Sequence, residues 1–318
     1  MRIDLQPEMR SSAARWAPLR RFIVAERRLG AWAAQTKARA AIYEFLRFGV
    51  KQAWACLFGG IMVGLLIGTH FWYPRGAPLA RYDFLVIAAV TIQILLLVSR
   101  FETLQEAKVI LLFHIVGTAM EIFKTSVGAW IYPEPGLFKI CGVPLFTGFM
   151  YASIGSYMTR AWQVFDFRFV RHPPLWVVQA LAVGVYVNFF AHYYVPDLRI
   201  ALFAIAAMLF WRTYIYYHVW RSYRCMPLLL ACFLAALFIL VAENVGTLTG
   251  TWLYPNQLHG WTPVGPAKLG SWFLLLIVSY AMVATLNRPR EPGSLAKQPG
   301  ERRAARPDLV AGPETATP

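Results

Sequence analysis

The sequence predicts an all-α, polytopic membrane protein with about eight transmembrane helices, arranged as two parallel four-helix repeats. Three observations predict this fold class. The chain is 58% hydrophobic and only 15% charged, whereas a soluble protein carries about 25% charged residues. Its apolar residues form long runs, and Lys and Arg gather between alternate runs. A motif in the first half of the chain also recurs 122 residues later.

The apolar runs predict the individual helices. A helix of about 20 residues spans the bilayer core, which is about 30 Å thick. The sequence offers such segments at 51–72, 83–100, 107–125, 143–162, 174–194, 198–219, 226–246 and 268–287. They divide into a first repeat at 51–165 and a second repeat at 166–288.

The two ends of the chain are polar. Residues 1–50 are basic and predict a cytoplasmic segment, in which apolar and Arg residues at 12–48 favour a partly interfacial helix. A solvated helix is an alternative for this stretch. Residues 289–318 are rich in Pro, Gly, Arg and Ala, which predicts a disordered cytoplasmic tail.

The distribution of positive charge predicts the orientation. With these spans, 25 of the 31 Lys and Arg residues lie on the side of the two termini, and 6 lie on the other side. Loops rich in Lys and Arg stay in the cytoplasm. We therefore expect a protein integral to the cytoplasmic (inner) membrane with both termini cytoplasmic. The net charge of +15 then reflects this retention and the attraction to anionic membrane lipid, and does not indicate a nucleic-acid partner.

Metal and cofactor motifs are missing from the sequence. The four cysteines, Cys56, Cys141, Cys225 and Cys232, lack the spacing of a zinc site. The sequence contains no Gly-rich phosphate loop, no HExxH and no GxSxG. We therefore predict no metal and no cofactor, and any chemistry must use side chains in or near the membrane.

The recurring motif reads E-x6-G-x-W-x-Y-P. Its first copy is Glu121, Gly128, Trp130, Tyr132 and Pro133, and its second copy is Glu243, Gly250, Trp252, Tyr254 and Pro255. Six of the 13 positions from 121 to 133 are identical in the second copy, against 14 identities in 100 for the whole alignment of 51–150 with 173–272. An internal duplication explains this contrast better than chance.

The duplication predicts a candidate binding site on the exterior side. An offset of four helices keeps the two halves in the same orientation, so equivalent residues lie at the same depth. The predicted substrate-binding residues are Glu121, Glu243, His70, His192, Trp130, Trp252, Tyr132 and Tyr254. His114, two helical turns before Glu121, is a candidate proton relay. The sequence leaves open whether the two acids share one cavity.

These residues also have structural interpretations. Trp and Tyr near a membrane interface usually anchor a span, and a His in the last turn of a transmembrane helix is often a solvated helix end. The two glutamates are costlier to place in an apolar helix. They indicate either a structural tie to Trp, Tyr or Thr, or binding and proton chemistry.

The same segments carry a family resemblance. From about residue 45 to 288, the W-x-Y-P and E-x6-G segments and the order of the spans resemble the YoaT-like bacterial membrane proteins, a domain of unknown function (number 817). The resemblance implies a multi-pass membrane protein and no particular activity.

A weaker likeness is to carotenoid-modifying membrane enzymes. In these enzymes an acid late in a helix precedes a G-x-x-x-Y loop and a G-V-P sequence that starts the next helix. The first repeat is similar at Glu121, Gly128, Tyr132 and Gly142–Val143–Pro144. The second repeat departs from the pattern, because it reads Val264–Gly265–Pro266.

Three functions fit the sequence. The first is a small-molecule permease or exchanger that uses the paired outer-side carboxylates. The second is an intramembrane, acid-catalysed enzyme of the isoprenoid or carotenoid type. The third is a non-catalytic membrane scaffold. The substrate is open, and a homo-oligomer is compatible with all three.

Overall fold

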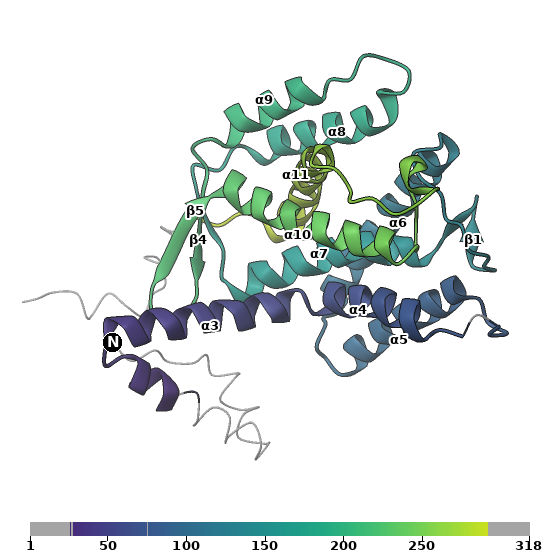
Figure 1. Ribbon diagram of the computed structural model, residues 1–318. Coiled ribbons are helices and arrows are strands. Elements are labelled where there is room, and N and C mark those ends of the chain that lie inside the picture. Colours follow the sequence, from purple (N-terminus) through teal and green to yellow (C-terminus); the bar gives the residue numbers. More distant parts are fainter. Residues whose placement is uncertain (1–25, 27, 75, 292–318) are drawn as a thin grey trace, which may run out of the picture. The chain divides into compact units, whose positions relative to one another are not determined.

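The computed structural model describes residues 26, 28–74 and 76–291, so most of the polar ends of the chain lie outside the described residues. The described part is mostly helical, as predicted. Residues 28–33 are helical, and the labelled helices are α3 (Lys37–Ala55), α4 (Leu57–Trp72), α5 (Arg81–Val98), α6 (Leu104–Ser126), α7 (Phe146–Val164), α8 (Leu175–Ala191), α9 (Arg199–Phe210), α10 (Leu228–Leu248), the short 3-10 helix η1 (Pro255–Gln257) and α11 (Ala267–Asn287) (Figure 1).

Two small sheets accompany the helices. Strand β1 (Lys139–Ile140) pairs antiparallel with β2 (Val143–Pro144) just before α7. A second sheet has the order β3 (Arg168–Val170), β4 (Tyr214–His218) and β5 (Tyr223–Pro227). The prediction of a purely helical chain is therefore corrected to a mostly helical one.

Four described helices are long and apolar enough to cross a membrane, namely α5, α6, α10 and α11. A fifth span arises if α3 and α4 are taken together, although these helices meet at an angle of 71°. Helix α8 has 17 residues and α9 has 12, which makes them short for a span. The apolar helices identify an integral membrane protein, whereas the number of eight spans and the orientation of the termini stay predictions.

One predicted helix is wrong over its second half. The segment 198–219 was expected to be helical throughout, but α9 ends at Phe210 and the chain continues as β4. The residues of β4 read YIYYH, and aromatic and β-branched side chains favour a strand over a helix. Strand β4 is held by antiparallel pairing with β3, in which Phe169 faces Ile215.

The described chain divides into two compact units. Unit 1 runs to Asp166 and also includes Tyr217–Arg224 and Ile239–Pro266, whereas unit 2 contains Phe167–Tyr216, Cys225–Phe238 and the described residues from Ala267. The boundary at Asp166 lies next to the predicted repeat boundary. The second motif, however, belongs to the same unit as the first. The repeat itself stays a prediction.

Unit 1 is built on the contact between α6 and α7. Two glycines let these helices approach closely: a Cβ atom on Gly117 would lie 2.6 Å from the Tyr151 side chain, and one on Gly155 would lie 2.7 Å from Phe113. Small residues at such crossings are typical of helix packing in membranes. This close packing fixes the position of Tyr151 against α6.

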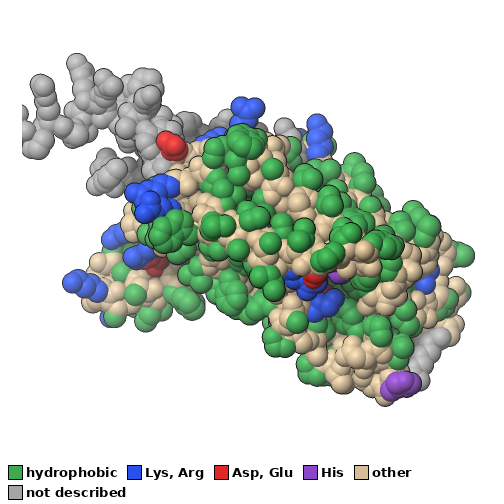
Figure 2. Space-filling model, turned by 90° about the horizontal axis from the view of Figure 1, so that it is seen from above, with side chains coloured by type: hydrophobic (Ala, Val, Ile, Leu, Met, Phe, Trp, Pro, Cys, Tyr) green, Lys and Arg blue, Asp and Glu red, His purple; other side chains and the backbone are tan. Residues whose placement is uncertain are grey.

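Large apolar side chains are exposed in both units. Phe45 is 74% exposed and Trp72 is 79% exposed in unit 1, and Ile200 is 84% exposed in unit 2. Figure 2 shows a face on which hydrophobic side chains dominate and charged ones gather in a few places. Such a surface is unfavourable in water but is expected against lipid.

Candidate functional site

The two motif copies begin with the same helix ending. Helix α6 is followed by Gly128 (φ 73°), and α10 is followed by Gly250 (φ 64°). In both places the backbone makes the paired hydrogen bonds of a Schellman motif, from Gly128 to Thr125 and from Gly250 to Thr247 among them. Glycine adopts this left-handed conformation without strain. Each turn reverses the chain so that the following Trp and Tyr lie beside the glutamate in the last turns of the helix.

Glu121 is the centre of the first copy. Its carboxyl group accepts hydrogen bonds from Trp130 Nε1 (2.7 Å), from the Tyr132 hydroxyl and from the Tyr151 hydroxyl (2.6 Å). The Glu121 residue is only 3% exposed. All three donors are uncharged, and among the described residues Glu121 forms no ion pair.

Glu243 repeats this arrangement in the second copy. Its Oε1 atom accepts hydrogen bonds from Trp252 Nε1 (3.3 Å) and from the Tyr254 hydroxyl. Trp252 lies directly against the helix, because a Cβ atom on Gly246 would be 2.0 Å from its ring. The structural tie that the sequence offered as one interpretation is thus present in both copies.

The two copies pair with each other at equivalent positions. Ile131 and Leu253, which are 122 residues apart, exchange two backbone hydrogen bonds of 2.9 and 3.0 Å in an antiparallel bridge. Beside this bridge, the Trp130 and Tyr254 rings meet edge to face at 6.0 Å. The carboxyl groups of Glu121 and Glu243 lie close enough to interact electrostatically. The two predicted acids therefore belong to one neighbourhood in unit 1.

The loop tyrosines of this neighbourhood stay protonated. Burial, together with the nearby charge of Glu121, raises the pKa of the Tyr132 hydroxyl well above its usual value. Burial and the charge of Glu243 likewise raise the pKa of Tyr254. Both phenols are therefore donors to the carboxyl groups at every physiological pH.

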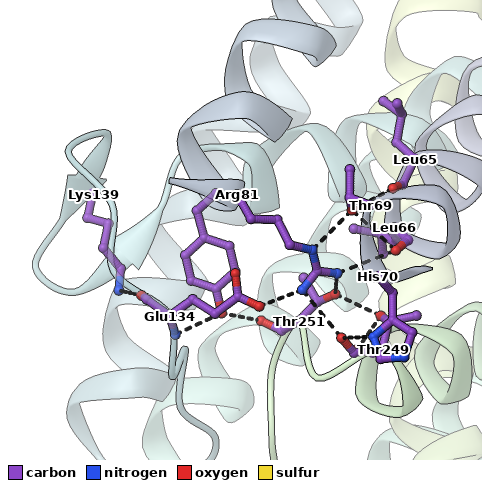
Figure 3. A network of polar contacts seen from close by, with 11 residues as sticks. Leu65, Leu66, Thr69, His70, Arg81, Glu134, Lys139, Thr249 and Thr251 are labelled. Carbon is purple, nitrogen blue, oxygen red and sulfur yellow. Dashed lines mark hydrogen bonds and ion pairs between the residues drawn. The ribbon is translucent and has the colours of Figure 1, made fainter. Parts of the chain in front are cut away.

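The chain segments that follow α6 and α10 are called here the first and the second segment. A second polar network, drawn in Figure 3, holds both segments against α4 and α5. Arg81 is 9% exposed, and it donates to Glu134 Oε1 (2.5 Å) in the first segment and to Thr251 Oγ1 (3.1 Å) in the second. Arg81 Nε also donates to Thr69 on α4 (3.0 Å). One guanidinium group thus links both segments to α4 and α5.

The predicted histidines have different surroundings. His70 Nδ1 donates to the Thr249 carbonyl oxygen (3.1 Å), so this ring belongs to the network of Arg81. His192 lies in unit 2, where its Nδ1 bonds to the Asn188 carbonyl oxygen of its own helix (2.9 Å). His114 packs on the Phe149 ring at 4.5 Å, and its Nδ1 atom is buried without a hydrogen-bond partner.

Sequence reasoning missed three residues of this region. Tyr151 supplies the third donor to Glu121. In the sequence, the one indication of this role is a polar hydroxyl within an apolar helix. Arg81 is one of the six Lys and Arg residues that the sequence places on the side opposite the termini, and Glu134 carried no signal, yet the two form an ion pair between α5 and the first segment. An Arg at the first position of an apolar helix is the signal that pointed to a buried role.

The two carboxyl groups have similar surroundings. Two carboxyl groups share an aromatic environment whose polar hydrogens all point at the carboxyl oxygens. Within the described ranges, no three His, Cys, Asp or Glu side chains come together to hold a metal ion.

Known structures share parts of this architecture. The fold is similar to that of MvINS, a mycobacterial Insig homolog from Mycobacterium vanbaalenii, with a TM-score of 0.41 and 14% sequence identity over 59% of this chain and 98% of that chain. A cross-linked MvINS trimer gives a TM-score of 0.40 and 15% identity over the same shares of the two chains.

Sequence comparison confirms the family resemblance. The chain is 42% identical over 251 residues to the "Uncharacterized protein YoaT" of Bacillus subtilis (strain 168), a match that covers 79% of this chain and 94% of the relative. Residues 44–280 match the family model described as "Protein of unknown function (DUF817)". The chain therefore belongs to the DUF817 family.

Proposed function

We propose that this protein is a small-molecule permease or exchanger, in which Glu121 and Glu243 bind either an organic cation or a proton. One observation carries the proposal: the buried carboxyl group of Glu121 is held by three uncharged donors and forms no ion pair among the described residues. The second acid, Glu243, interacts with it electrostatically.

The energy of a buried charge supports a cation or proton at this site. An ionised carboxylate taken out of water is unfavourable unless it is paired or well hydrogen-bonded. Neutral donors stabilise such a charge but do not cancel it, and a neighbouring carboxylate adds repulsion. A proton or a cation placed between Glu121 and Glu243 relieves both effects. The site is therefore suited to exchange, because the two ions compete for the same groups.

The surrounding aromatic side chains indicate the class of solute. Trp130 and Tyr254 contact each other beside the carboxyl groups, and Tyr132 and Trp252 are bonded to them. Aromatic faces attract cations and are most effective when water is excluded. We therefore expect an organic cation with an apolar body, such as a quaternary ammonium compound, rather than a small inorganic ion.

Binding would also loosen the two segments. A proton or cation on Glu121 weakens the hydrogen bonds that hold Trp130 and Tyr132, since bonds to a charged acceptor are about twice as strong as bonds to a neutral one. The paired segments around Ile131 and Leu253 are the parts that would then move. His70 lies beside them through Thr249, and His114 is proposed as the relay for the released proton.

Acid catalysis on a lipid fits this geometry less well. A general acid must carry a proton and present it to the substrate. In its three hydrogen bonds Glu121 is instead the acceptor, which is the arrangement of a carboxylate rather than of a proton donor.

Transport can be tested with the purified protein in liposomes that contain a pH-sensitive dye. An inward gradient of benzyltrimethylammonium, tetraethylammonium or ethidium should drive proton efflux through the wild type and not through empty liposomes. We expect Glu121→Gln and Glu243→Gln to abolish this flux. The matched control is Glu106→Gln, because Glu106 forms the capping box at the start of the same helix and Gln also serves there.

Two results would contradict transport. One is Glu121→Gln with the flux of the wild type. The other is a folded wild-type protein that moves no protons with any of these cations, which would favour the membrane scaffold.

A further inference from the structure

The beginning of α6 carries a second buried ionic cluster, distinct from the motif site. Glu102 Oε1 and Arg160 Nη2 form an ion pair of 2.8 Å, and the two side chains are 0% and 2% exposed. Gln93 Nε2 donates to the other carboxyl oxygen of Glu102, and the Ser156 hydroxyl lies 3.4 Å from Oε1. The cluster thus joins α5, α6 and α7 at one place.

Several polar atoms of this cluster have no partner. Arg160 Nε, Arg160 Nη1 and Gln93 Oε1 are buried and accept or donate no hydrogen bond. A buried polar group without a hydrogen-bond partner is energetically costly, so a missing partner is expected. Trp54 contributes a ring 5.8 Å from the Arg160 guanidinium carbon, but a ring face satisfies no acceptor such as Gln93 Oε1.

The chemistry of these atoms selects the missing partner. It must accept from the N–H groups of Arg160 and donate to the amide oxygen of Gln93. A simple anion such as chloride cannot donate, and any anion would be repelled by Glu102, whereas a simple cation cannot accept from Arg160. Water does both, and buried waters typically make about three such hydrogen bonds.

The position of the cluster relates it to the motif site. Glu102 immediately precedes the N-cap of α6, and Glu121 lies near the other end of the same helix. At about 1.5 Å per residue the two acids are separated by about 28 Å along the helix, close to the thickness of the bilayer core, about 30 Å. The buried polar atoms of His114 and Thr118, which have no partner, lie between them on α6.

We propose that Glu102, Arg160 and Gln93 form a hydrated proton-exchange site at the end of α6 opposite Glu121. The proposal rests on the proposed exchange function and adds a second proton-binding site to the one at Glu121 and Glu243. A hydronium ion from the aqueous side transfers its proton to Glu102, an O–H bond forms on the carboxyl group, and water remains. Arg160 keeps its charge and turns from Glu102 to the water. The reverse step returns the proton.

Infrared spectroscopy tests this site without any transport assay. Difference spectra between neutral and acidic pH, recorded in bilayers and in both H₂O and D₂O, should show a protonated carboxyl band that shifts in D₂O. The part of this band that comes from Glu102 should be missing from Glu102→Gln and present in Glu106→Gln, while any contribution of Glu121 and Glu243 remains in both variants. Identical spectra for the wild type and Glu102→Gln would overturn the proposal.

Flux measurements separate this inference from the proposed function. We expect Glu102→Gln to lose cation-driven proton flux while it still binds benzyltrimethylammonium, because Glu121 and Glu243 are unchanged. The double variant Glu102→Gln/Arg160→Gln leaves no unpaired buried charge and guards against misfolding. If both variants keep wild-type flux while Glu121→Gln loses it, the second proton-binding site is refuted and the exchanger stands. If the wild type shows no flux, the exchanger fails and the infrared band alone decides whether the site takes up a proton.

Discussion

The hydroxyl group of Tyr151 offers the sharpest test of the charge on Glu121. It donates to Glu121 Oε1 at 2.6 Å from a different helix. Tyr151→Phe removes this hydroxyl and keeps the ring, which packs on Gly117. The substitution therefore deletes a single hydrogen bond and leaves the α6–α7 contact in place.

The size of the effect depends on the acceptor. A hydrogen bond to a charged group contributes about 1.5–3 kcal/mol, whereas one between neutral groups contributes about 0.5–1.5 kcal/mol. Tyr73 provides the neutral reference, because its hydroxyl donates to the Leu79 carbonyl oxygen at 2.8 Å. With a carboxylate at Glu121, Tyr151→Phe should lower the free energy of unfolding by about 2 kcal/mol. Tyr73→Phe should lower it by about 1 kcal/mol.

The assay is reversible unfolding of the protein in mixed micelles at neutral pH, analysed as a double-mutant cycle with Glu121→Gln. We expect the Tyr151→Phe effect to shrink in the Glu121→Gln background, with a coupling free energy of about 1–2 kcal/mol. If Tyr151→Phe costs no more than Tyr73→Phe and shows no coupling to Glu121, the carboxyl group is not the charged acceptor described above.

Three further predictions concern other parts of the chain. Gly246→Ala should clash with the Trp252 ring and destabilise the protein by about 1–3 kcal/mol, whereas Gly64→Ala, with nothing within 4 Å of its Cβ position, should not; thermal unfolding compares the two. Arg81→Gln should lower the free energy of unfolding by about 2–3 kcal/mol. In a variant that keeps Trp252 as its single Trp, it should also shift the emission to longer wavelength, because Trp252 becomes more exposed to solvent; an unchanged spectrum would contradict the linking role of Arg81. Burial raises the pKa of Asp197, but the hydrogen bonds that it accepts hold the pKa below its usual value. Stability from Asp197 is therefore present above the ordinary Asp pKa and lost as the pH falls through the lowered one, and unfolding in acid should show this loss in the wild type and not in Asp197→Asn.

The hydrogen bonds between the glutamate and the aromatic residues within each motif could be predicted from the sequence because they are local. Glu121 and Trp130 are separated by one helical turn and one tight turn, and Gly128 marks that turn. Fixed local geometry therefore brings the indole to the carboxyl group. The same reasoning holds for Glu243 and Trp252, and for the mostly helical fold, which follows from long apolar runs.

Contacts between distant segments could not be predicted in this way. Periodicity alone does not show that Ile131 pairs with Leu253 or that Tyr151 reaches Glu121, because both depend on how helices pack. The buried position of Arg81 could not be predicted either, since the sequence does not show the Thr and carbonyl groups that satisfy it. The early end of α9 was missed because its apolar run continues into β4, where aromatic residues pair with β3.

Binding of benzyltrimethylammonium to the purified protein tests the central claim most directly. Equilibrium dialysis would compare the wild type, the Glu121→Gln/Glu243→Gln variant and the Glu106→Gln control at neutral and acidic pH. We predict saturable binding to the wild type and the control that weakens in acid, as expected when protons compete for the same carboxyl groups, and no binding to the double variant. Equal, pH-independent binding by all three proteins would contradict a cation and proton site at Glu121 and Glu243.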